Sequence, residues 1–135
     1  MDMTTTLEIS AKGMAAQNTR LRVIAENLAN AVTTGSTPGA NPYQRKTVTF
    51  QNRLDRTMGA NAVSVKKIAH DTTAFPQKYD PSSPAADTSG YVKTPNVNSF
   101  VEVMDMKEAQ RTYSANVNVL ATTRGMMLHT LDLLK

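Results

Sequence analysis

The chain has 135 residues, a formal net charge of +4, 40% hydrophobic and 5% aromatic residues, and no cysteine. This length suggests one compact domain, or a smaller one flanked by extended helices. The lack of cysteine excludes disulfides, thiolate chemistry and cysteine-ligated metals, and the few aromatic residues argue against a dense aromatic core.

Residues 3–31 are predicted to form one long helix. No proline occurs before Pro38, and Glu8 follows Thr5 at the spacing of a capping box, so we expect a threonine cap. A seven-residue spacing of apolar side chains is typical of a coiled-coil seam. It comprises Leu7, Met14, Leu21 and Leu28, interleaved by Met3, Ile24 and Ala31.

A second apolar series runs along this predicted helix. It comprises Ile9, Ala16 and Val23, and it lies about 200° around the axis from the first series. A helix with apolar side chains on opposite faces needs neighbours on both. One further helix of the same chain can cover only one face, so the pattern favours packing between molecules.

The middle segment is predicted to contain loops and short strands. Turn formers fill 32–42, strands are expected at 43–50 and 63–68, and 76–95 is mostly irregular with a possible strand at 90–93. The segment also holds the excess of positive charge: Arg45, Lys46, Arg53, Arg56, Lys66, Lys67, Lys78 and Lys93. A small basic nucleic-acid-binding module is therefore the alternative function, although the charges are scattered and stacking aromatics are few.

Residues 98–134 are predicted to form the second helix, with Asn98 or Ser99 as its cap. Its seven-residue series comprises Met106, Tyr113, Leu120, Met127 and Leu134, interleaved by Val103, Val117 and Leu131. Gly125 allows close packing or a bend. The last part is apolar on every side, and this chain alone offers too little to bury it.

The predicted fold is mainly α, with long N- and C-terminal helices packed in a coiled-coil-like manner and joined by a small β-hairpin or irregular middle. We expect an N-terminal assembly helix at 1–31, a loop and β-rich segment at 32–97 and a C-terminal assembly helix at 98–135. The spacing alone leaves open whether the apolar series pair within one chain or between chains.

No catalytic, cofactor or metal site is expected, and the chain is predicted not to be an enzyme. His70 and His129 lie in different segments without a second ligand at metal-binding spacing, and no glycine-rich phosphate loop occurs. Glu102, Asp105 and Glu108 are best interpreted as a solvated helix face. No apolar run is long enough for membrane insertion, and no cleavable N-terminal signal is recognisable.

Several motifs occur in an order that is specific to one family. Residues 14–30, which end in Asn27-Leu28-Ala29-Asn30, resemble the N-terminal signature of bacterial flagellar rod, hook and axial proteins. The remaining matches narrow the resemblance to the proximal-rod proteins. They are Pro42-Tyr43-Gln44-Arg45-Lys46, Tyr79-Asp80-Pro81, Gly90-Tyr91-Val92, Pro95-Asn96-Val97-Asn98, Glu102-Val103-Met104, Arg111-Thr112-Tyr113-Ser114-Ala115-Asn116 and Met126-Met127-Leu128-His129-Thr130-Leu131.

The resemblance implies a structural subunit of the proximal rod of the flagellar basal body, the drive shaft between membrane ring and hook. Such proteins are exported by the flagellar type III apparatus without signal cleavage and polymerise in the periplasm through their terminal helices. The implied partners are further copies, neighbouring proximal-rod subunits, a basal-body adaptor protein and the distal rod, with no nucleic acid.

The resemblance also suggests roles within the first motif. Leu28 should face the seam, while Asn27 and Asn30 should tie the helix end to the following loop. Asn30 could instead be a simple cap, because asparagine tolerates the left-handed conformation. The predicted assembly interface comprises Leu7, Met14, Leu21, Ile24, Asn27, Leu28, Asn30, Val103, Met106, Tyr113, Val117, Leu120, Met127, Leu131 and Leu134.

Overall fold

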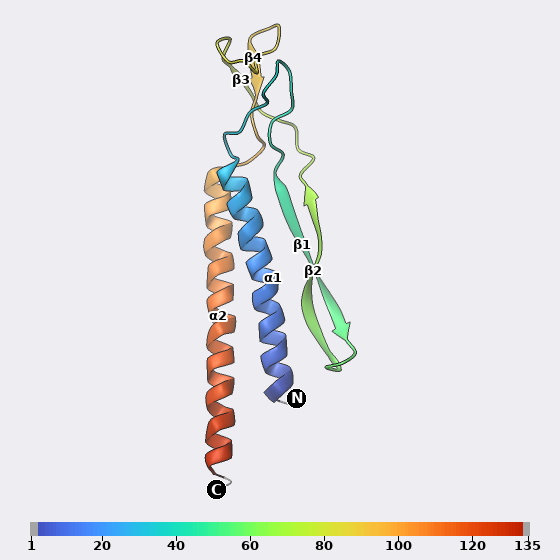
Figure 1. Ribbon diagram of the computed structural model, residues 1–135, viewed down its shortest axis with the longest axis vertical. Helices are drawn as coiled ribbons and strands as arrows, with labels where there is room; N and C mark the ends of the chain where they lie inside the picture. Colours follow the sequence, from blue (N-terminus) through green and yellow to red (C-terminus); the bar gives the residue numbers. More distant parts are fainter. Residues whose placement is uncertain (1–2, 134–135) are drawn as a thin grey trace. The chain divides into compact units, whose positions relative to one another are not determined.

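The computed structural model describes residues 3–133. Two long helices enclose four strands in the sequence, which confirms the predicted arrangement of terminal helices and a small β middle (Figure 1). The elements are α1 (Met3–Ala29), β1 (Lys46–Asp55), β2 (Ala60–His70), β3 (Gln77–Tyr79), β4 (Tyr91–Lys93) and α2 (Ser99–Asp132). Within the described range, neither helix is long and apolar enough to cross a membrane.

The two predicted helix caps had different outcomes. Asn98 caps α2, because its Oδ1 accepts hydrogen bonds from the backbone N–H groups of Phe100 (3.0 Å) and Val101 (3.3 Å). The capping box at Thr5 was wrong: α1 already includes Met3, so Thr5 lies inside its first turn.

The strands form two separate two-stranded sheets, β1–β2 and β3–β4. β1 starts later than predicted and continues to Asp55, because backbone pairing with β2 extends the strand through polar residues of low β propensity. β3 was not predicted. It pairs antiparallel with β4, Lys78 opposite Val92, and Gly90 beside it has a φ of 81°. A Cβ at Gly90 would lie 2.9 Å from the Tyr79 ring, so a larger residue would displace that ring.

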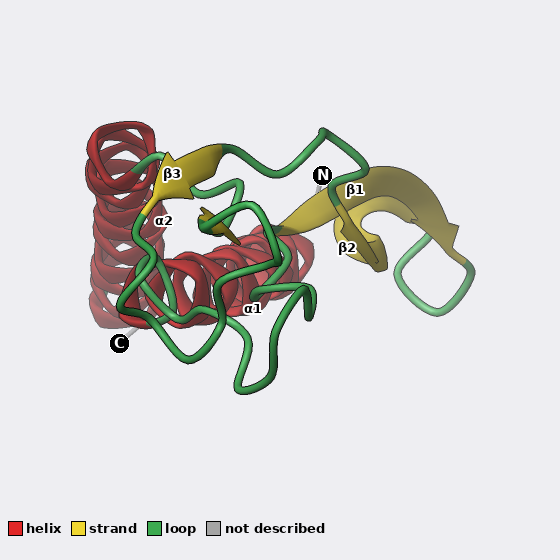
Figure 2. Ribbon diagram, turned by 90° about the horizontal axis from the view of Figure 1, so that it is seen from above, coloured by secondary structure: helices red, strands yellow, loops and turns green. Residues whose placement is uncertain are grey.

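The chain divides into two compact units. Among the described residues, unit 1 comprises 3–21, 48–67 and 107–133. Within it, α1 lies between α2 on one side and the β1–β2 hairpin on the other (Figures 1 and 2). Its buried residues are all small: Ser10, Ala16, Ala62, Ala109 and Thr123.

Unit 2 comprises 22–47 and 68–106. It holds the end of α1, the start of α2, the β3–β4 pair and the long loops drawn in green in Figure 2. Its core combines aliphatic with polar side chains, since the buried residues are Val23, Ile24, Asn27, Pro42, Ala85, Val92, Pro95 and Glu102.

Candidate functional site

The first asparagine of the Asn-Leu-Ala-Asn motif is at the centre of a hydrogen-bonded cluster in unit 2. The Asn27 amide nitrogen donates to the carbonyl oxygen of Lys46 (2.8 Å) and to Glu102 (3.1 Å). Its amide oxygen accepts from the Lys46 backbone N–H (2.9 Å) and from the Tyr43 hydroxyl (2.9 Å). The whole hydrogen-bonding capacity of this side chain is therefore used. It joins the end of α1 to the following loop, as predicted, and also to the first turn of α2.

Glu102 is only 1% exposed, so its interpretation as part of a solvated face was wrong. One of its carboxylate oxygens accepts from Arg45 Nε at 2.6 Å, and the other accepts from Asn27. Arg45 also lies near Asp71 (3.5 Å) and Asp105 (3.7 Å). A carboxylate this deeply buried requires a charged partner and further donors. Arg45 and Asn27 supply both.

The segment 71–73 is tied to the same cluster. The Asn96 side chain accepts from the Arg45 backbone N–H (2.8 Å) and donates to the carbonyl oxygens of Asp71 and Thr73, both at 3.1 Å. The Asp71 backbone N–H donates to the Arg45 carbonyl at 2.8 Å. We call this cluster the polar junction. It comprises Asn27, Tyr43, Arg45, Lys46, Asp71, Asn96 and Glu102.

Electrostatics within unit 2 favour the ionised forms at the edge of the polar junction. Lys46 donates to Glu26 at 2.9 Å, and this hydrogen bond together with the lysine charge lowers the pKa of Glu26. The same contact raises the pKa of Lys46. Burial raises the pKa of the Tyr43 hydroxyl, which keeps it protonated as a donor to Asn27.

Asn30 caps α1 by its side chain and not by its backbone conformation. Its amide nitrogen donates to the Glu26 carbonyl at 2.8 Å, and its backbone N–H donates to the same oxygen at 3.1 Å. The expected left-handed conformation is wrong, because no non-glycine residue in the described chain has a positive φ. Its link to the loop is local: the Thr33 hydroxyl donates to Asn30 at 3.2 Å.

In unit 1, small and polar side chains lie where α1 meets α2. A Cβ built on Gly13 would lie 3.1 Å from the Asn116 side-chain nitrogen, so the two helices approach closely there. Arg20 pairs with Glu108 at 3.4 Å. Because residue 13 lies against 116 and residue 20 against 108, the two helices run antiparallel within this unit.

The buried seven-residue series of α2 is not the predicted one. Glu102, Ala109 and Thr123 are buried, and they lie about 60° around the helix from the Met106 series. Coiled-coil packing of the predicted series is thus not confirmed. Of the predicted interface residues, Ile24 and Asn27 are buried. The half-buried ones are Leu7, Met14, Leu21, Leu28, Asn30, Met106, Leu120 and Met127. The exposed ones are Val103, Tyr113, Val117 and Leu131. Leu134 lies outside the described residues.

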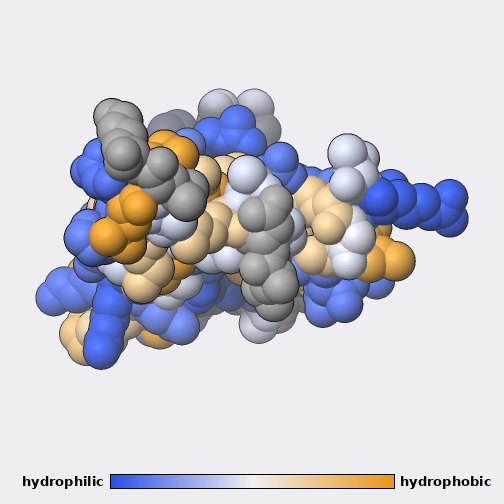
Figure 3. Space-filling view, turned by 90° about the horizontal axis from the view of Figure 1, so that it is seen from below, coloured by the Kyte–Doolittle hydropathy of each residue, from blue (hydrophilic) through white to orange (hydrophobic). Residues whose placement is uncertain are grey.

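The end of α2 is exposed and apolar, as predicted. By the pairing of residue 13 with 116, Met3 lies opposite residue 126, so α2 continues beyond the described start of α1. Met126, Leu128 and Leu131 are 55–58% exposed and Leu133 is 75% exposed. Figure 3 shows this hydrophobic surface in orange at the end of α2. We call residues 126–133 the α2 tail. Gly125 just before it has open space around it, so it does not mediate close packing within the chain.

Comparisons with known proteins match both ends of the chain. Residues 7–37 match the family model "Flagella basal body rod protein", and residues 88–133 match "Flagellar basal body rod FlgEFG protein C-terminal". The FlgC flagellar basal-body rod protein of Agrobacterium fabrum is 52% identical over 95% of this chain and 92% of its own length. Those of Salmonella typhimurium and Bacillus subtilis are 41% and 35% identical over 93% and 94% of this chain, and 93% and 95% of their own lengths.

The chain belongs to the FlgC family of flagellar basal-body rod proteins. The resemblance of its motifs is therefore confirmed, and its role is that of a structural rod subunit. The FlgC relatives are structural rod proteins and not enzymes. Neither the structure nor these relatives supports the nucleic-acid-binding alternative. Within the described range, no group of three or more potential ligands could hold a metal ion.

Several members of the polar junction of this FlgC-family chain were not recognised as functional residues. The charge pattern treats Arg45 and Lys46 as scattered charges and Glu102 as solvated, and it assigns none of them a partner. One available signal was that all three lie within the motifs that carry the family resemblance. The hydrogen bond between Arg45 and Glu102 joins positions 57 residues apart, which local patterns do not reveal.

Proposed function

We propose that this rod subunit polymerises through its two terminal helices into the proximal rod, and that the packed helices transmit torque along the drive shaft. The observation that carries the proposal is the exposure of Val103, Val117 and Leu131 along one predicted series of α2. Exposed apolar side chains that recur along one side of a helix favour packing against a neighbouring helix. Neighbouring copies in a rod would bury it.

The assembly interface that we propose is the predicted set of residues on α1 and α2. Small and polar side chains at the α1–α2 contact of unit 1 leave Leu7, Met14 and Leu21 half-buried. Coiled-coil-like packing of these side chains then occurs between chains. In this arrangement 1–31 and 98–135 act as assembly helices, and 32–97 forms the segment between them.

Assembly and folding are coupled in this proposal, most strongly in unit 1. Burying one large aliphatic side chain contributes roughly 1.5–3 kcal/mol, whereas the buried residues among the described part of unit 1 are alanine, serine and threonine. That unit gains little from its own core to offset the entropy cost of ordering. Contacts with neighbouring copies would supply the missing burial.

Family membership supports the remaining elements of the proposal. The chain acts in the periplasmic part of the basal body, after export by the flagellar type III apparatus without signal cleavage. It contacts neighbouring proximal-rod subunits, an adaptor protein and the distal rod. It has no catalytic activity, requires no cofactor or metal, and inserts into no membrane.

A charge placed on the exposed series tests the proposal. In a strain lacking its own copy of this protein, Val117→Asp should abolish rod assembly and swimming, because a carboxylate cannot be buried between apolar helices. Val117 is 41% exposed, so the free energy of unfolding of the isolated chain should change by less than about 0.5 kcal/mol.

Asn118→Asp is the matched control, since it adds the same charge at the next, exposed and already polar position. This variant should assemble and swim. Normal rods containing Val117→Asp would contradict the proposal, as would an equal loss of motility in both variants.

A further inference from the structure

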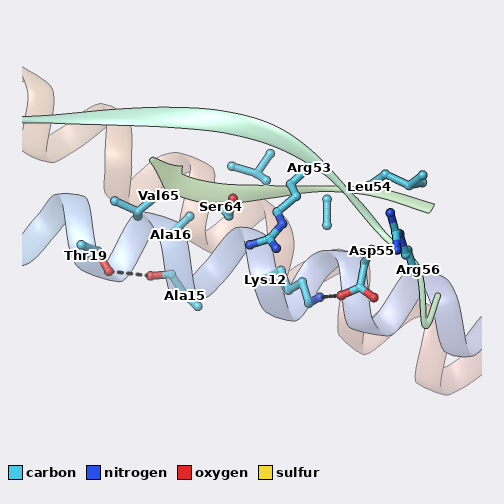
Figure 4. A pocket seen from close by; sticks show the side chains of 12 residues that line it. Lys12, Ala15, Ala16, Thr19, Arg53, Leu54, Asp55, Arg56, Ser64 and Val65 are labelled. Carbon is cyan, nitrogen blue, oxygen red and sulfur yellow. Dashed lines mark hydrogen bonds and ion pairs between the residues drawn. The ribbon is translucent and has the colours of Figure 1, made fainter. Parts of the chain in front are cut away.

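A groove in unit 1 runs between α1 and the β1–β2 hairpin (Figure 4). Its volume is about 990 Å³. The side chains from α1 that line it are mostly small, with Ala15, Ala16 and Thr19 forming the helix side. Small side chains allow another helix to approach closely, since little projects from the surface of α1.

The hairpin side of the groove combines charged side chains with accessible apolar ones. Leu54 is 57% exposed and Val63 is 43% exposed. Lys12 on α1 and Asp55 on β1 both line the groove, and their ion pair joins the helix to the hairpin there (Figure 4). Arg53 and Arg56 add positive charge, and neither forms an ion pair with another described residue.

We propose that this groove receives the α2 tail of a second copy of the chain. The inference rests on the proposed polymerisation and deepens it by assigning one specific contact. The tail presents Met126, Leu128 and Leu131, whose exposed side chains would contact the apolar members of the groove lining. The negative end of the α2 dipole and the Asp132 carboxylate complement Arg53 and Arg56.

The tail and the groove are different surfaces of the same unit. In the proposed contact each copy offers its tail to one neighbour and its groove to another, which makes the contact heterologous and distinguishes it from a reciprocal exchange between two copies. Heterologous contacts that do not close into a ring generate open helical filaments. This geometry suits a subunit that adds repeatedly along a rod.

Disulfide trapping tests this contact cleanly, because the chain has no cysteine of its own. Rods from cells that carry Val63→Cys together with Leu131→Cys are oxidised and run on denaturing gels. The expected result is a ladder of linked copies. The matched pair Ser89→Cys with Leu131→Cys places the first cysteine on an exposed residue of unit 2 and should give monomers.

A second variant blocks the groove without changing the tail. Ala15→Trp should abolish the ladder, whereas Ala11→Trp, one turn earlier and outside the groove, should preserve it. Both α1 positions are exposed, so circular dichroism of the isolated chains should match. If the cysteines prevent rod assembly, the two single-cysteine chains are purified, mixed and oxidised, and a mixed dimer is expected.

Assembled rods that give no ladder, or purified mixtures that give no mixed dimer, would overturn the groove contact. So would a ladder that persists with Ala15→Trp. None of these results would affect the rod-subunit function, which fails instead if cells lacking the protein still build rods and swim.

Discussion

The two units of the chain bury different kinds of side chain. Unit 2 buries Val23, Ile24 and Val92 together with the polar pair of Asn27 and Glu102. In unit 1, every buried residue that the structure describes is alanine, serine or threonine. Both units contain parts of α1 and α2, so the kind of buried side chain changes along each of these continuous helices.

The difference indicates which half can maintain its own structure. Unit 2 has hydrogen-bonded charges and aliphatic burial, which together fix one arrangement. Unit 1 has close approach of backbones but little apolar burial, and the large apolar side chains described in it are half-buried or exposed. We infer that unit 2 provides the stable base and that unit 1 is completed by other copies.

Among the predicted changes in the free energy of unfolding, the largest should come from breaking the polar junction of unit 2. Arg45→Met leaves the Glu102 carboxylate buried without its guanidinium partner, which typically costs about 3–5 kcal/mol. Urea unfolding of the isolated chain followed by circular dichroism measures the loss. Lys67→Met, at an exposed position of β2, is the control and should change little. Equal stabilities of the two variants would mean that the polar junction does not stabilise unit 2.

A pair of glycine substitutions compares the packed and open parts of unit 1. Gly13→Leu should destabilise the chain by about 1–3 kcal/mol, because the new side chain would displace Asn116 from the helix contact. Gly125 has open space around it, so Gly125→Leu should stabilise α2 by about 1 kcal/mol through its higher helix propensity. Thermal melts of both isolated variants measure the difference. Shifts of the same sign would contradict the assigned helix contact.

The smallest expected effect concerns the ion pair beside the groove. The Lys12 hydrogen bond, helped by the Thr57 backbone N–H, lowers the pKa of Asp55 from 3.8 to about 2. Since the folded pKa lies below the unfolded value, the contribution to stability is complete above pH 3.8 and is lost as pH falls through about 2. NMR titration of Asp55 measures this pKa.

Removing the cation should shift the titration in a defined direction. In Lys12→Met the pKa of Asp55 should rise towards 3.8 without reaching it, because the Thr57 hydrogen bond remains. Lys12→Arg keeps the charge and should keep the pKa low. An unchanged titration in Lys12→Met would show that the lysine does not contact Asp55 in solution.

Local patterns predicted much of this fold because the interactions concerned are local. The turn formers of 32–42 predict the end of the first helix, and the residues before the second predict Asn98 or Ser99 as its cap, of which Asn98 is the one used. Strand limits were less accurate, and β3 was missed, because a three-residue strand depends on its partner rather than on its own propensity. The role of Asn27 was only partly predicted, since Glu102 and Tyr43 come from other segments.

The sequence by itself determined the family and the two long helices. It also determined that these helices carry apolar side chains that need packing partners. Those properties follow from motif order and periodicity, which can be read directly from the linear sequence. Only the tertiary structure decided that Glu102, Ala109 and Thr123 would be buried while Val117 and Leu131 stayed exposed. The rotation of one helix against another depends on the close approach at Gly13 and the charges around Arg45, and these partners meet only after folding.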